Sequence, residues 1–495
     1  MMYCALCINI FFLQQIPAQD ITDAIIDLND VRQVISGFGA ANILQWRPDM
    51  NTGDIEKAFG TDEGQIGFTI LRLRIPPSAT EFRNNITTAQ AACARGVKII
   101  GSPWSPPAYM KSNNNLVAGR LRQDAYAAYA EYLKSFVDFM AENGVPIYAV
   151  SVQNEPDVRV DYESCDWNAG EMLSFVKENA PAIGTNIIAP ESFHFDHALS
   201  DPILNDDIAV ANVSIIGGHL YGGGLESYPL AGSKGKQIWM TEYLDTDTTW
   251  NRVLATGKQM NDCMTAGMSA YIWWYIVRFY GPIGEDGNVT KRGYIMSQYS
   301  RFIRPGYERI NATERPQRRL YVTAYKSDSN VIIVVVNQSS SPAEQTFGIQ
   351  GIYAREPVFT PYVTSRTKNC LQESDLQVNK GSFTVIFEGE SVTTLVGENV
   401  IDSTQTPQTI TLYQNFPNPF YQSTKISYTV PSSGIVSLKV FNVLGQEIKT
   451  LVHAYHDTGE YKVLFNAMNL SCGIYFYTLK VGDNSAVTKK MLLIH

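Results

Sequence analysis

Eight short apolar runs alternate with helix-length amphipathic segments between about residue 35 and residue 277 of this chain. Glycine, proline or polar residues bound each run, which is typical of strands buried on both faces of a parallel sheet. Eight strand–helix repeats of this length favour a (β/α)8 TIM barrel, an α/β fold. The runs cover residues 34–41, 68–75, 97–103, 147–153, 186–189, 213–220, 237–241 and 269–275.

A doubly wound open sheet is the alternative for such a pattern, and it normally carries a glycine-rich phosphate turn after its first strand. Gly37-Phe38-Gly39 is not followed by the spacing of that turn, so the barrel is favoured. The clearest helix is predicted at residues 124–143, where six apolar side chains share one face. Asp124 is expected to be its N-cap, and Gly144 is expected to end it.

The sequence texture changes after Pro305 and again after a Ser/Thr/Gln/Pro-rich stretch at residues 402–408. A chain of 495 residues is too long for one ordinary core, so two or three domains are expected. We predict a signal peptide (1–18), a first strand of a side domain (19–34), the barrel (35–304), a side β-sandwich (305–398), a linker (399–410) and a small all-β domain (411–495). Residues 24–28 are expected to join the side sheet. Further strands are predicted at 320–326, 330–337, 345–352, 381–388, 391–396, 424–430, 434–442, 459–466, 474–481 and 486–494.

Charge and local composition exclude several classes of function. The formal net charge of -9 disfavours nucleic acid, because such partners require a basic surface. The apolar run at residues 5–13 is too short to span a bilayer and suits a signal peptide, so no membrane-spanning segment is expected. Cys4 and Cys7 have no second pair to complete a zinc site, and the other five cysteines are expected to be buried free thiols. We expect a monomer that needs no cofactor and no metal.

Two carboxylates lie at the ends of predicted strands four and seven, in Val152-Gln153-Asn154-Glu155-Pro156 and Trp239-Met240-Thr241-Glu242-Tyr243. Carboxyl ends of barrel strands face the active-site mouth, and these two strands lie across it. Paired carboxylates about 5 Å apart cleave a glycosidic bond with retention of configuration, one as nucleophile and one as acid/base. Asn154 would then hydrogen-bond the 2-hydroxyl of the reacting sugar. The bland alternative is that both glutamates are solvated loop residues.

These motifs resemble glycoside hydrolase family 30. The resemblance rests on Asn154-Glu155-Pro156 and Thr241-Glu242-Tyr243, on Ser102-Pro103-Trp104-Ser105-Pro106-Pro107, and on His219-Leu220-Tyr221-Gly222. Gly37-Phe38-Gly39, Trp273-Trp274-Tyr275 and the segments 291–294 and 302–306 also fit. The similarity extends over residues 37–396 and includes the side β-domain. It implies a retaining glycosidase with Glu155 as acid/base and Glu242 as nucleophile.

Within that family the chain is most similar to the bacterial glucuronoxylanases, which implies glucuronoxylan of plant cell walls as the substrate. Their loop after strand eight reads a methylglucuronic acid branch, and its uronate-pairing arginine corresponds to Arg278. Val277 and Phe279 replace an arginine and a serine usual in that loop, and the loop at residues 243–250 is shorter, so the dependence on the branch is expected to be loosened. Other activities in the family, on β-1,6-glucan or a glucosyl lipid, and a non-catalytic polysaccharide-binding protein are the alternatives.

The resemblance also implies a shell of substrate-binding residues. Trp274 would floor the reacting subsite and Trp104 would form its wall, while Tyr221 and Tyr243 would hydrogen-bond near the nucleophile. Either Arg72 or Arg74 would keep Glu242 ionised, because strand alternation puts both on one face. The shell is completed by His219, Tyr275, Arg278 and Tyr280.

The C-terminal unit resembles the sorting domain of the Bacteroidetes type IX secretion pathway. The matching residues are Gln414–Phe420, Phe441–Gly445, Gly473–Phe476 and Lys489–Met491. This implies a secreted or cell-surface protein whose partner is the secretion machinery. A small carbohydrate-binding sandwich is the alternative, but a binding row of exposed aromatics would require more than Tyr475 and Tyr477. Two metal-like patterns, His194-Phe195-Asp196-His197 and Glu285-Asp286-Gly287-Asn288, are interpreted as ordinary loops.

Overall fold

Eight parallel strands close into a barrel in chain order, and each lies within or overlaps one of the eight predicted apolar runs. The computed structural model describes residues 23–351, 358–398, 410–415, 418, 420, 423–467, 470–482 and 486–493. The predicted signal peptide, the Cys4–Cys7 pair and most of the predicted linker lie outside these residues. The barrel strands are β2 (Gly37–Ala41), β3 (Ile70–Ile75), β4 (Lys98–Pro103), β5 (Ile147–Ser151), β6 (Asn186–Ser192), β7 (Ile215–His219), β8 (Gln237–Glu242) and β9 (Ala270–Tyr275).

Apolar side chains fill the lower part of the barrel, and polar ones follow them toward its mouth. Along β3, alternation places Ile70 in the apolar layer and Arg72 and Arg74 above it. The same change occurs along β4, from Ile100 to Ser102. The barrel is therefore a packed core, and the polar side chains of β3 and β4 follow the apolar layer toward its carboxyl end. The apolar layer consists of Ile70, Ile100, Ala149, Ile188, Ile215, Trp239, Ala270 and Ile272.

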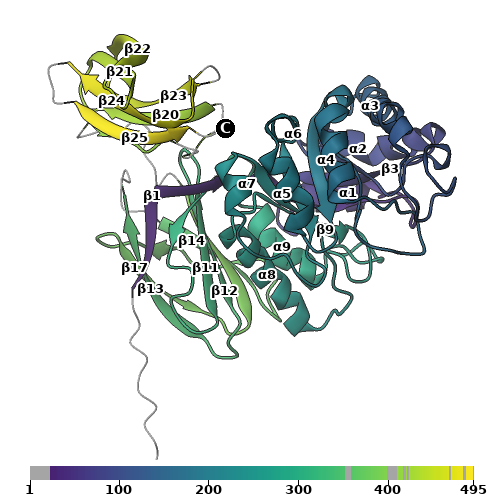
Figure 1. Ribbon diagram of the computed structural model, residues 1–495. Coiled ribbons are helices and arrows are strands. Elements are labelled where there is room, and N and C mark those ends of the chain that lie inside the picture. Colours follow the sequence, from purple (N-terminus) through teal and green to yellow (C-terminus); the bar gives the residue numbers. More distant parts are fainter. Residues whose placement is uncertain are drawn as a thin grey trace, which may run out of the picture.

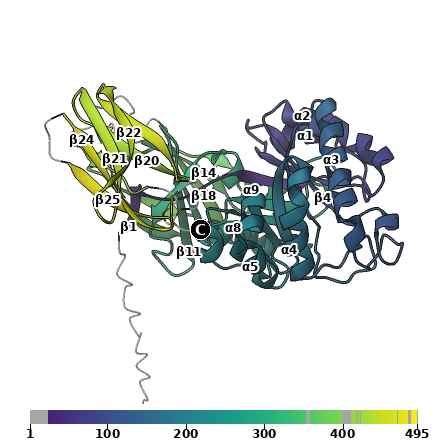
Figure 2. The ribbon, with the colours of Figure 1, turned by 45° about the horizontal axis from the view of Figure 1, so that its top comes forward.

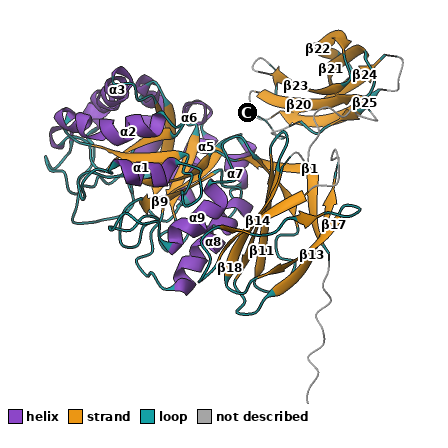
Figure 3. Ribbon diagram, turned by 180° about the vertical axis from the view of Figure 1, so that it is seen from behind, coloured by secondary structure: helices purple, strands orange, loops and turns teal. Residues whose placement is uncertain are grey.

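Helices surround the barrel strands (Figure 3). They are α1 (Thr52–Phe59), α2 (Ile86–Cys93), α3 (Tyr126–Glu142), α4 (Ala169–Glu178), α5 (His197–Asn205), α6 (Asp207–Asn212), α7 (Pro229–Ser233), α8 (Trp250–Thr265) and α9 (Lys291–Ser300). No helix within the described residues is long and apolar enough to cross a membrane.

The helix predicted at residues 124–143 is α3, but its predicted N-cap is wrong. Residues 123–125 form a 3-10 turn that runs directly into the helix, so Asp124 does not cap it. Its carboxylate instead accepts a hydrogen bond from Arg122 Nε at 3.0 Å. At the other end the prediction is confirmed: the helix stops at Glu142, and Gly144 adopts a left-handed φ of 74° just beyond it.

A ten-stranded sheet forms the side domain, and the first described strand, β1 (Ala24–Val34), joins it as expected by pairing with β10 and β13. The sheet curls over itself: Phe359 and Phe383, from strands near its opposite edges, stack with centroids 5.0 Å apart. The other strands are β10 (Glu308–Ala312), β11 (Leu320–Lys326), β12 (Val331–Asn337), β13 (Ala343–Gln350), β14 (Val358–Thr364), β15 (Leu371–Gln372), β16 (Leu376–Gln377), β17 (Ser382–Phe387) and β18 (Ser391–Gly397).

Strand β12 explains how the side domain is fixed to the barrel. Ile332, Val334 and Val336 belong to the barrel's core, whereas Val331, Ile333 and Val335 pack inside the side domain. Both faces of this strand are buried, so it is an unbroken apolar run. Figure 1 shows α8 and α9 between the barrel and this green sheet.

The C-terminal unit is a small sandwich of two sheets with its own apolar core. It lies beside the side domain and away from α1 to α4 of the barrel (Figures 1 and 2). Tyr475 and Tyr477 are buried in its core, so they do not form an exposed sugar-binding row. Its strands are β19 (Thr411–Leu412), β20 (Ser423–Val430), β21 (Gly434–Asn442), β22 (Glu447–His456), β23 (Gly459–Asn466), β24 (Gly473–Val481) and β25 (Val487–Leu493).

The five cysteines in the described residues are free thiols. Cys165, Cys263 and Cys370 are buried as predicted, and Cys93 is half-buried. Cys472 is exposed, which corrects the expectation of burial. It precedes β24 in a turn of the C-terminal unit, where the chain is at the surface.

Candidate active site

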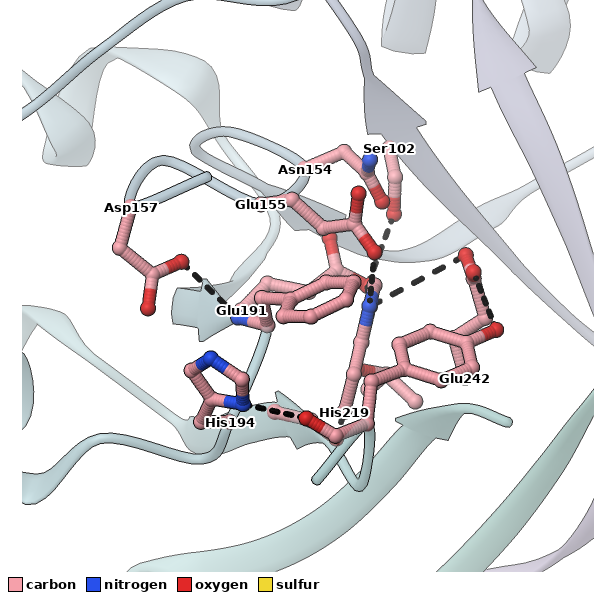
Figure 4. Close-up of polar contacts among 12 residues, drawn as sticks. Ser102, Asn154, Glu155, Asp157, Glu191, His194, His219 and Glu242 are labelled. Carbon is pink, nitrogen blue, oxygen red and sulfur yellow. Dashed lines mark hydrogen bonds and ion pairs between the residues drawn. The ribbon is translucent and has the colours of Figure 1, made fainter. Parts of the chain in front are cut away.

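The two glutamates predicted from the strand ends converge at the mouth of the barrel (Figure 4). A carboxylate oxygen of Glu155, one of Glu242 and a ring nitrogen of His219 all lie within 4.8 Å of one another. Glu242 is the last residue of β8, and Glu155 follows β5. Both side chains are almost fully buried, so they are not the solvated loop residues of the bland alternative.

Both oxygens of Glu242 accept hydrogen bonds. Arg72 Nη1 donates to Oε2 at 2.5 Å, and the Tyr221 hydroxyl donates to Oε1 at 2.9 Å. Burial raises the pKa of Glu242; His219 and Arg72 oppose that increase, whereas the charge of Glu155 adds to it. Two carboxylates this close do not ionise independently, and the pair tends to retain a proton.

Glu155 is held in a left-handed backbone conformation, with a φ of 47° that non-glycine residues adopt rarely. Its N–H donates to the carbonyl of Glu191 at 3.0 Å. Its side chain contacts His219 Nδ1 at 3.0 Å and accepts a hydrogen bond from the Tyr162 hydroxyl at 3.3 Å. Asn154, next to it, accepts from Arg72 Nη2 at 2.6 Å, so both residues of the Asn-Glu pair are fixed before substrate arrives.

Arg72 and Arg74 lie on the same face of β3, but only Arg72 contacts Glu242. Arg74 is one layer closer to the mouth, where Nε and Nη2 form a bidentate pair with Glu163 at 2.8 and 2.6 Å. Although burial opposes it, the charges of Glu191 and Glu242 raise the pKa of Arg72, which is fully buried. Arg72 is therefore a permanent cation beneath the two glutamates.

A third carboxylate, Glu191, completes this network and was not predicted. It follows Pro190 near the end of β6, where the pairing with β7 shifts register, and its φ is 60°. Such a bulge redirects a side chain that strict alternation would send the other way. Its Oε1 lies 3.1 Å from Arg72 Nη2 and accepts from Ser102 Oγ at 3.2 Å. The sequence did hold a signal for this residue, because Glu191 follows an apolar run as Glu155 and Glu242 do. It was missed because the predicted strand ended at residue 189, whereas β6 continues to Ser192.

His219 lies between the three glutamates and is fully buried. Its Nδ1 is 3.0 Å from Glu155, and its Nε2 is 3.7 Å from Glu191 and 4.0 Å from Glu242. Burial lowers the pKa of His219, but Glu242, Glu155 and Glu191 outweigh it and raise the pKa to about 9. His219 is thus enclosed by the carboxylates and is not exposed to a sugar in the mouth, which corrects its prediction as a substrate-binding residue.

Aromatic rings surround the mouth above the carboxylates. The rings of Trp104 and Trp274 lie 5.6 Å apart, and the Arg72 guanidinium is 4.8 Å from the Trp104 centroid. The Trp46 ring centroid lies 5.8 Å from that of Trp104 and 6.1 Å from that of Trp274. Trp46 is 37% exposed and Tyr162 is 39% exposed. Trp46 and Tyr162 were not predicted, although both follow barrel strands. Rings that are partly exposed above a buried polar floor suit the apolar faces of sugars.

The remaining predicted residues lie around this core. The Tyr243 ring stacks on the ring of Tyr221, with centroids 5.6 Å apart, and so packs against the residue that donates to Glu242. Arg278 lies over the Tyr275 ring at 5.4 Å, and the Tyr275 hydroxyl donates to the carbonyl of Ile43. Tyr280 is buried beside Arg278 in the same loop. Arg278 Nη1 faces Glu285 at 3.5 Å, an acidic neighbour that the sequence did not reveal.

Glu155, His219 and Glu242 are spaced closely enough to be considered as metal ligands. The permanent charge of Arg72 and its direct contact with Glu242 oppose a cation there. His194 contacts the Tyr221 carbonyl through Nδ1, and His197 stacks on Tyr228, so the two do not face a shared ligand. The arrangement suits acid/base and nucleophilic chemistry by carboxylates.

Comparisons with known proteins agree with this geometry. Residues 42–179 match the glycosyl hydrolase family 30 TIM-barrel domain. Glucuronoxylanase XynC of Bacillus subtilis (strain 168) is 41% identical over 390 residues, which is 76% of this chain and 92% of that protein. The chain belongs to glycoside hydrolase family 30. It is thus a glycoside hydrolase, and the resemblance inferred from the motifs is confirmed.

Other relatives are similar to this chain to different degrees. The subfamily 8 xylanase Xyn30A of Clostridium acetobutylicum superposes with a TM-score of 0.72 at 37% identity, covering 76% of this chain and 99% of that structure. An endo-1,6-beta-D-glucanase of Trichoderma harzianum is 24% identical, and the similarity covers 44% of this chain and 52% of the glucanase.

Residues 414–494 match the secretion system C-terminal sorting domain. This confirms the second resemblance and assigns the C-terminal sandwich to export. The glycoside hydrolase is accordingly secreted or attached to the cell surface.

Proposed function

We propose that this protein is a secreted retaining endo-β-1,4-xylanase that hydrolyses glucuronoxylan, with Glu155 as acid/base and Glu242 as nucleophile. The observation that carries the proposal is the separation of the two carboxylates, whose nearest oxygens lie within 4.8 Å. Retaining glycosidases keep their carboxyl groups about 5–5.5 Å apart, whereas inverting enzymes need about 6.5–9.5 Å to admit a water molecule.

The contacts of the two glutamates support the proposed roles. Arg72 and Tyr221 donate to both oxygens of Glu242, which favours its ionised, nucleophilic form. Glu155, which contacts His219 and not Arg72, is then the proposed acid/base. Glu242 attacks the anomeric carbon while Glu155 protonates the departing oxygen, and a glycosyl–enzyme ester forms. Glu155 next takes a proton from water, whose oxygen attacks the same carbon and releases Glu242.

The substrate class follows from the relatives and the mouth of the site. The Bacillus relative is named a glucuronoxylanase and the Clostridium structure a xylanase. The partly exposed rings of Trp46 and Trp274 would contact a sugar chain, with the buried Trp104 packed against both, and Asn154 lies next to the acid to receive a 2-hydroxyl. An endo-acting enzyme of this kind would cut internal xylosidic bonds.

Recognition of the uronic acid branch would fall to Arg278, whose guanidinium can bind a carboxylate. Its side chain is one-third exposed and already faces Glu285. Phe279, which is 57% exposed, offers no hydrogen bond where the related loops have serine. We therefore propose that the branch is preferred but not strictly required.

The remaining parts of the proposal concern organisation. The barrel (35–304) and side domain (19–34 and 305–398) would form the catalytic unit, and the domain at 411–495, after the linker at 399–410, would be the address recognised by the secretion machinery. The protein would be a monomer, and residues 1–18 would be a signal peptide. Plant cell-wall glucuronoxylan is the proposed partner outside the cell.

Alanine replacements at Glu155 and Glu242 test the assignment. Each should lower xylan cleavage by several orders of magnitude, because each removes one half of the double displacement. Azide should restore turnover: an adduct of retained configuration in Glu155→Ala identifies the acid/base, and one of inverted configuration in Glu242→Ala identifies the nucleophile. Glu163→Gln, at a buried carboxylate paired with Arg74, is the matched control and should stay active. Near-normal activity in both alanine variants would refute the assignment.

Mass analysis of products separates the alternatives. Xylo-oligosaccharides released from glucuronoxylan, with nothing released from β-1,6-glucan, would exclude a glucanase. Binding of xylan without release of reducing ends would favour a non-catalytic surface protein. Comparing branched with debranched xylan then measures how strictly the branch is required.

A further inference from the structure

Glu191 is a fully buried carboxylate that the double displacement does not use. It makes an ion pair with Arg72 at 3.1 Å, and its Oε2 is buried with no hydrogen-bond partner in the described structure. A buried charge that is only partly satisfied is costly and is retained where it has a function. Its other charged neighbour is His219, which in turn contacts Glu155 (Figure 4).

We propose that Glu191 is a positioning residue that keeps the catalytic proton on the Glu155–His219 pair, with His219 as its reservoir. The proposal rests on the proposed function, because it takes Glu155 as the acid/base. Nothing in the double displacement itself requires a third carboxylate at this place.

The geometry links Glu191 to the acid in two ways. Its main-chain carbonyl accepts the N–H of Glu155 at 3.0 Å, so the two left-handed residues support each other's conformation. Its carboxylate lies 3.7 Å from His219 Nε2, while His219 Nδ1 lies 3.0 Å from Glu155. A charge at Glu191 therefore acts on one ring nitrogen, and the acid lies at the other.

The proton balance of the pair is simple. Before the reaction, Glu155 and His219 share one transferable proton, which is either on the carboxyl or is the second N–H of the imidazolium. When the leaving oxygen takes that proton, Glu155 is a carboxylate and His219 is neutral. The attacking water returns a proton to the pair, so no external acid is required.

The groups that face His219 determine how firmly this proton is held. The carboxylates of Glu155, Glu191 and Glu242 favour a protonated ring, and so does the more distant charge of Asp157. Arg72 and the Tyr221 hydroxyl both donate to Glu242, and the Tyr221 ring packs edge-on against His219. The net effect raises the pKa of His219 to about 9, and Arg72 lowers the pKa of Glu191 to about 2 despite its burial. Glu191 is therefore charged throughout the range in which the pair holds its proton.

Glu191→Gln tests the proposal, since it keeps the shape and removes the charge. The readout is kcat/KM on soluble xylan from pH 4 to pH 10. The basic limb should move to lower pH by at least about one unit, because a charge within 4 Å contributes more than 1.36 kcal/mol at an effective dielectric constant of about 20. Arg74, on the same strand as Arg72, pairs with Glu163 in a similar way. Glu163→Gln breaks that pair and should leave the basic limb of the pH profile unchanged.

Titration of the His219 ring by NMR in the wild-type protein gives a second measurement, which does not depend on Glu191→Gln. With six histidines in the chain, the signal of His219 is assigned by comparison with His219→Gln. The proposal requires its pKa to lie well above the ordinary value of about 6.5. A pKa near 6.5, an unmoved basic limb in Glu191→Gln, or an equal shift in Glu163→Gln would overturn it. If Glu155→Ala remained active, the proposed function itself would have failed instead.

Discussion

Replacing Arg278 with alanine separates recognition of the branch from cleavage of the bond. Charge-assisted hydrogen bonds to a carboxylate contribute about 1.5–3 kcal/mol. The substrate must first displace Glu285, which lies 3.5 Å from Arg278 in a partly exposed pair worth about 1 kcal/mol at most. If the full value of about 1 kcal/mol is lost, the net contribution is about 0.5–2 kcal/mol, and kcat/KM on glucuronoxylan should fall by at least roughly 2- to 30-fold.

Debranched xylan and linear xylo-oligosaccharides provide the control, because they carry no uronate. Their kcat/KM values, measured from the release of reducing ends, should be nearly unchanged in Arg278→Ala. Arg278→Lys should recover only part of the loss on glucuronoxylan, since an ammonium lacks the planar fork of guanidinium. An equal loss on branched and unbranched substrates would show that Arg278 supports the fold and does not read the branch.

Three further variants and conditions test the electrostatics of the site. Glu285→Gln should raise kcat/KM on glucuronoxylan up to about fivefold and leave debranched xylan unaffected, because it frees Arg278 from a competing carboxylate; no change would remove Glu285 from the account. Arg72→Met should lower the free energy of unfolding by about 3–5 kcal/mol in chemical denaturation, since it leaves Glu191 and Glu242 buried without their cation; a smaller loss than 1 kcal/mol would contradict this. The pKa of Glu191 is lowered to about 2, so its stabilisation is present above the unfolded pKa of about 4.3 and is lost as the pH falls toward 2. The gap in melting temperature between wild type and Glu191→Gln should therefore narrow from pH 5 to pH 2. His219, with a pKa of about 9, contributes stability below pH 6.5 that is lost as the pH rises through 9.

The barrel could be predicted because parallel strands covered by helices are apolar on both faces, and eight such runs stand out in the sequence. Two of the strands that were missed have sequences that lack a clear strand pattern. β22 (Glu447–His456) is mostly exposed, and β14 (Val358–Thr364) contains Pro361, which argues against a strand in the sequence. Asp124 looked like an N-cap because its residue type is favoured there, but the preceding 3-10 turn made a cap unnecessary.

The two central glutamates were found because each follows a buried strand at the end where barrels place their chemistry. The sequence does not show how deep a side chain lies within the barrel. Strand alternation makes Arg72 and Arg74 equivalent, and only the packing shows that Arg72 contacts Glu242 while Arg74 contacts Glu163. Glu191 was missed because a register shift near the end of β6 redirects its side chain, and a period of two cannot reveal a bulge. Trp46 belongs to a loop whose course the sequence does not specify.

The configuration of the first product tests the central claim most directly. Proton NMR can follow the anomeric signals during the first minutes of xylan hydrolysis, before mutarotation mixes the anomers. Because the oxygens of Glu155 and Glu242 lie within 4.8 Å, the new reducing end should appear first as the β anomer, with the configuration of the bond that was cut. Initial release of the α anomer would show inversion and contradict the assignment of Glu242 as a nucleophile.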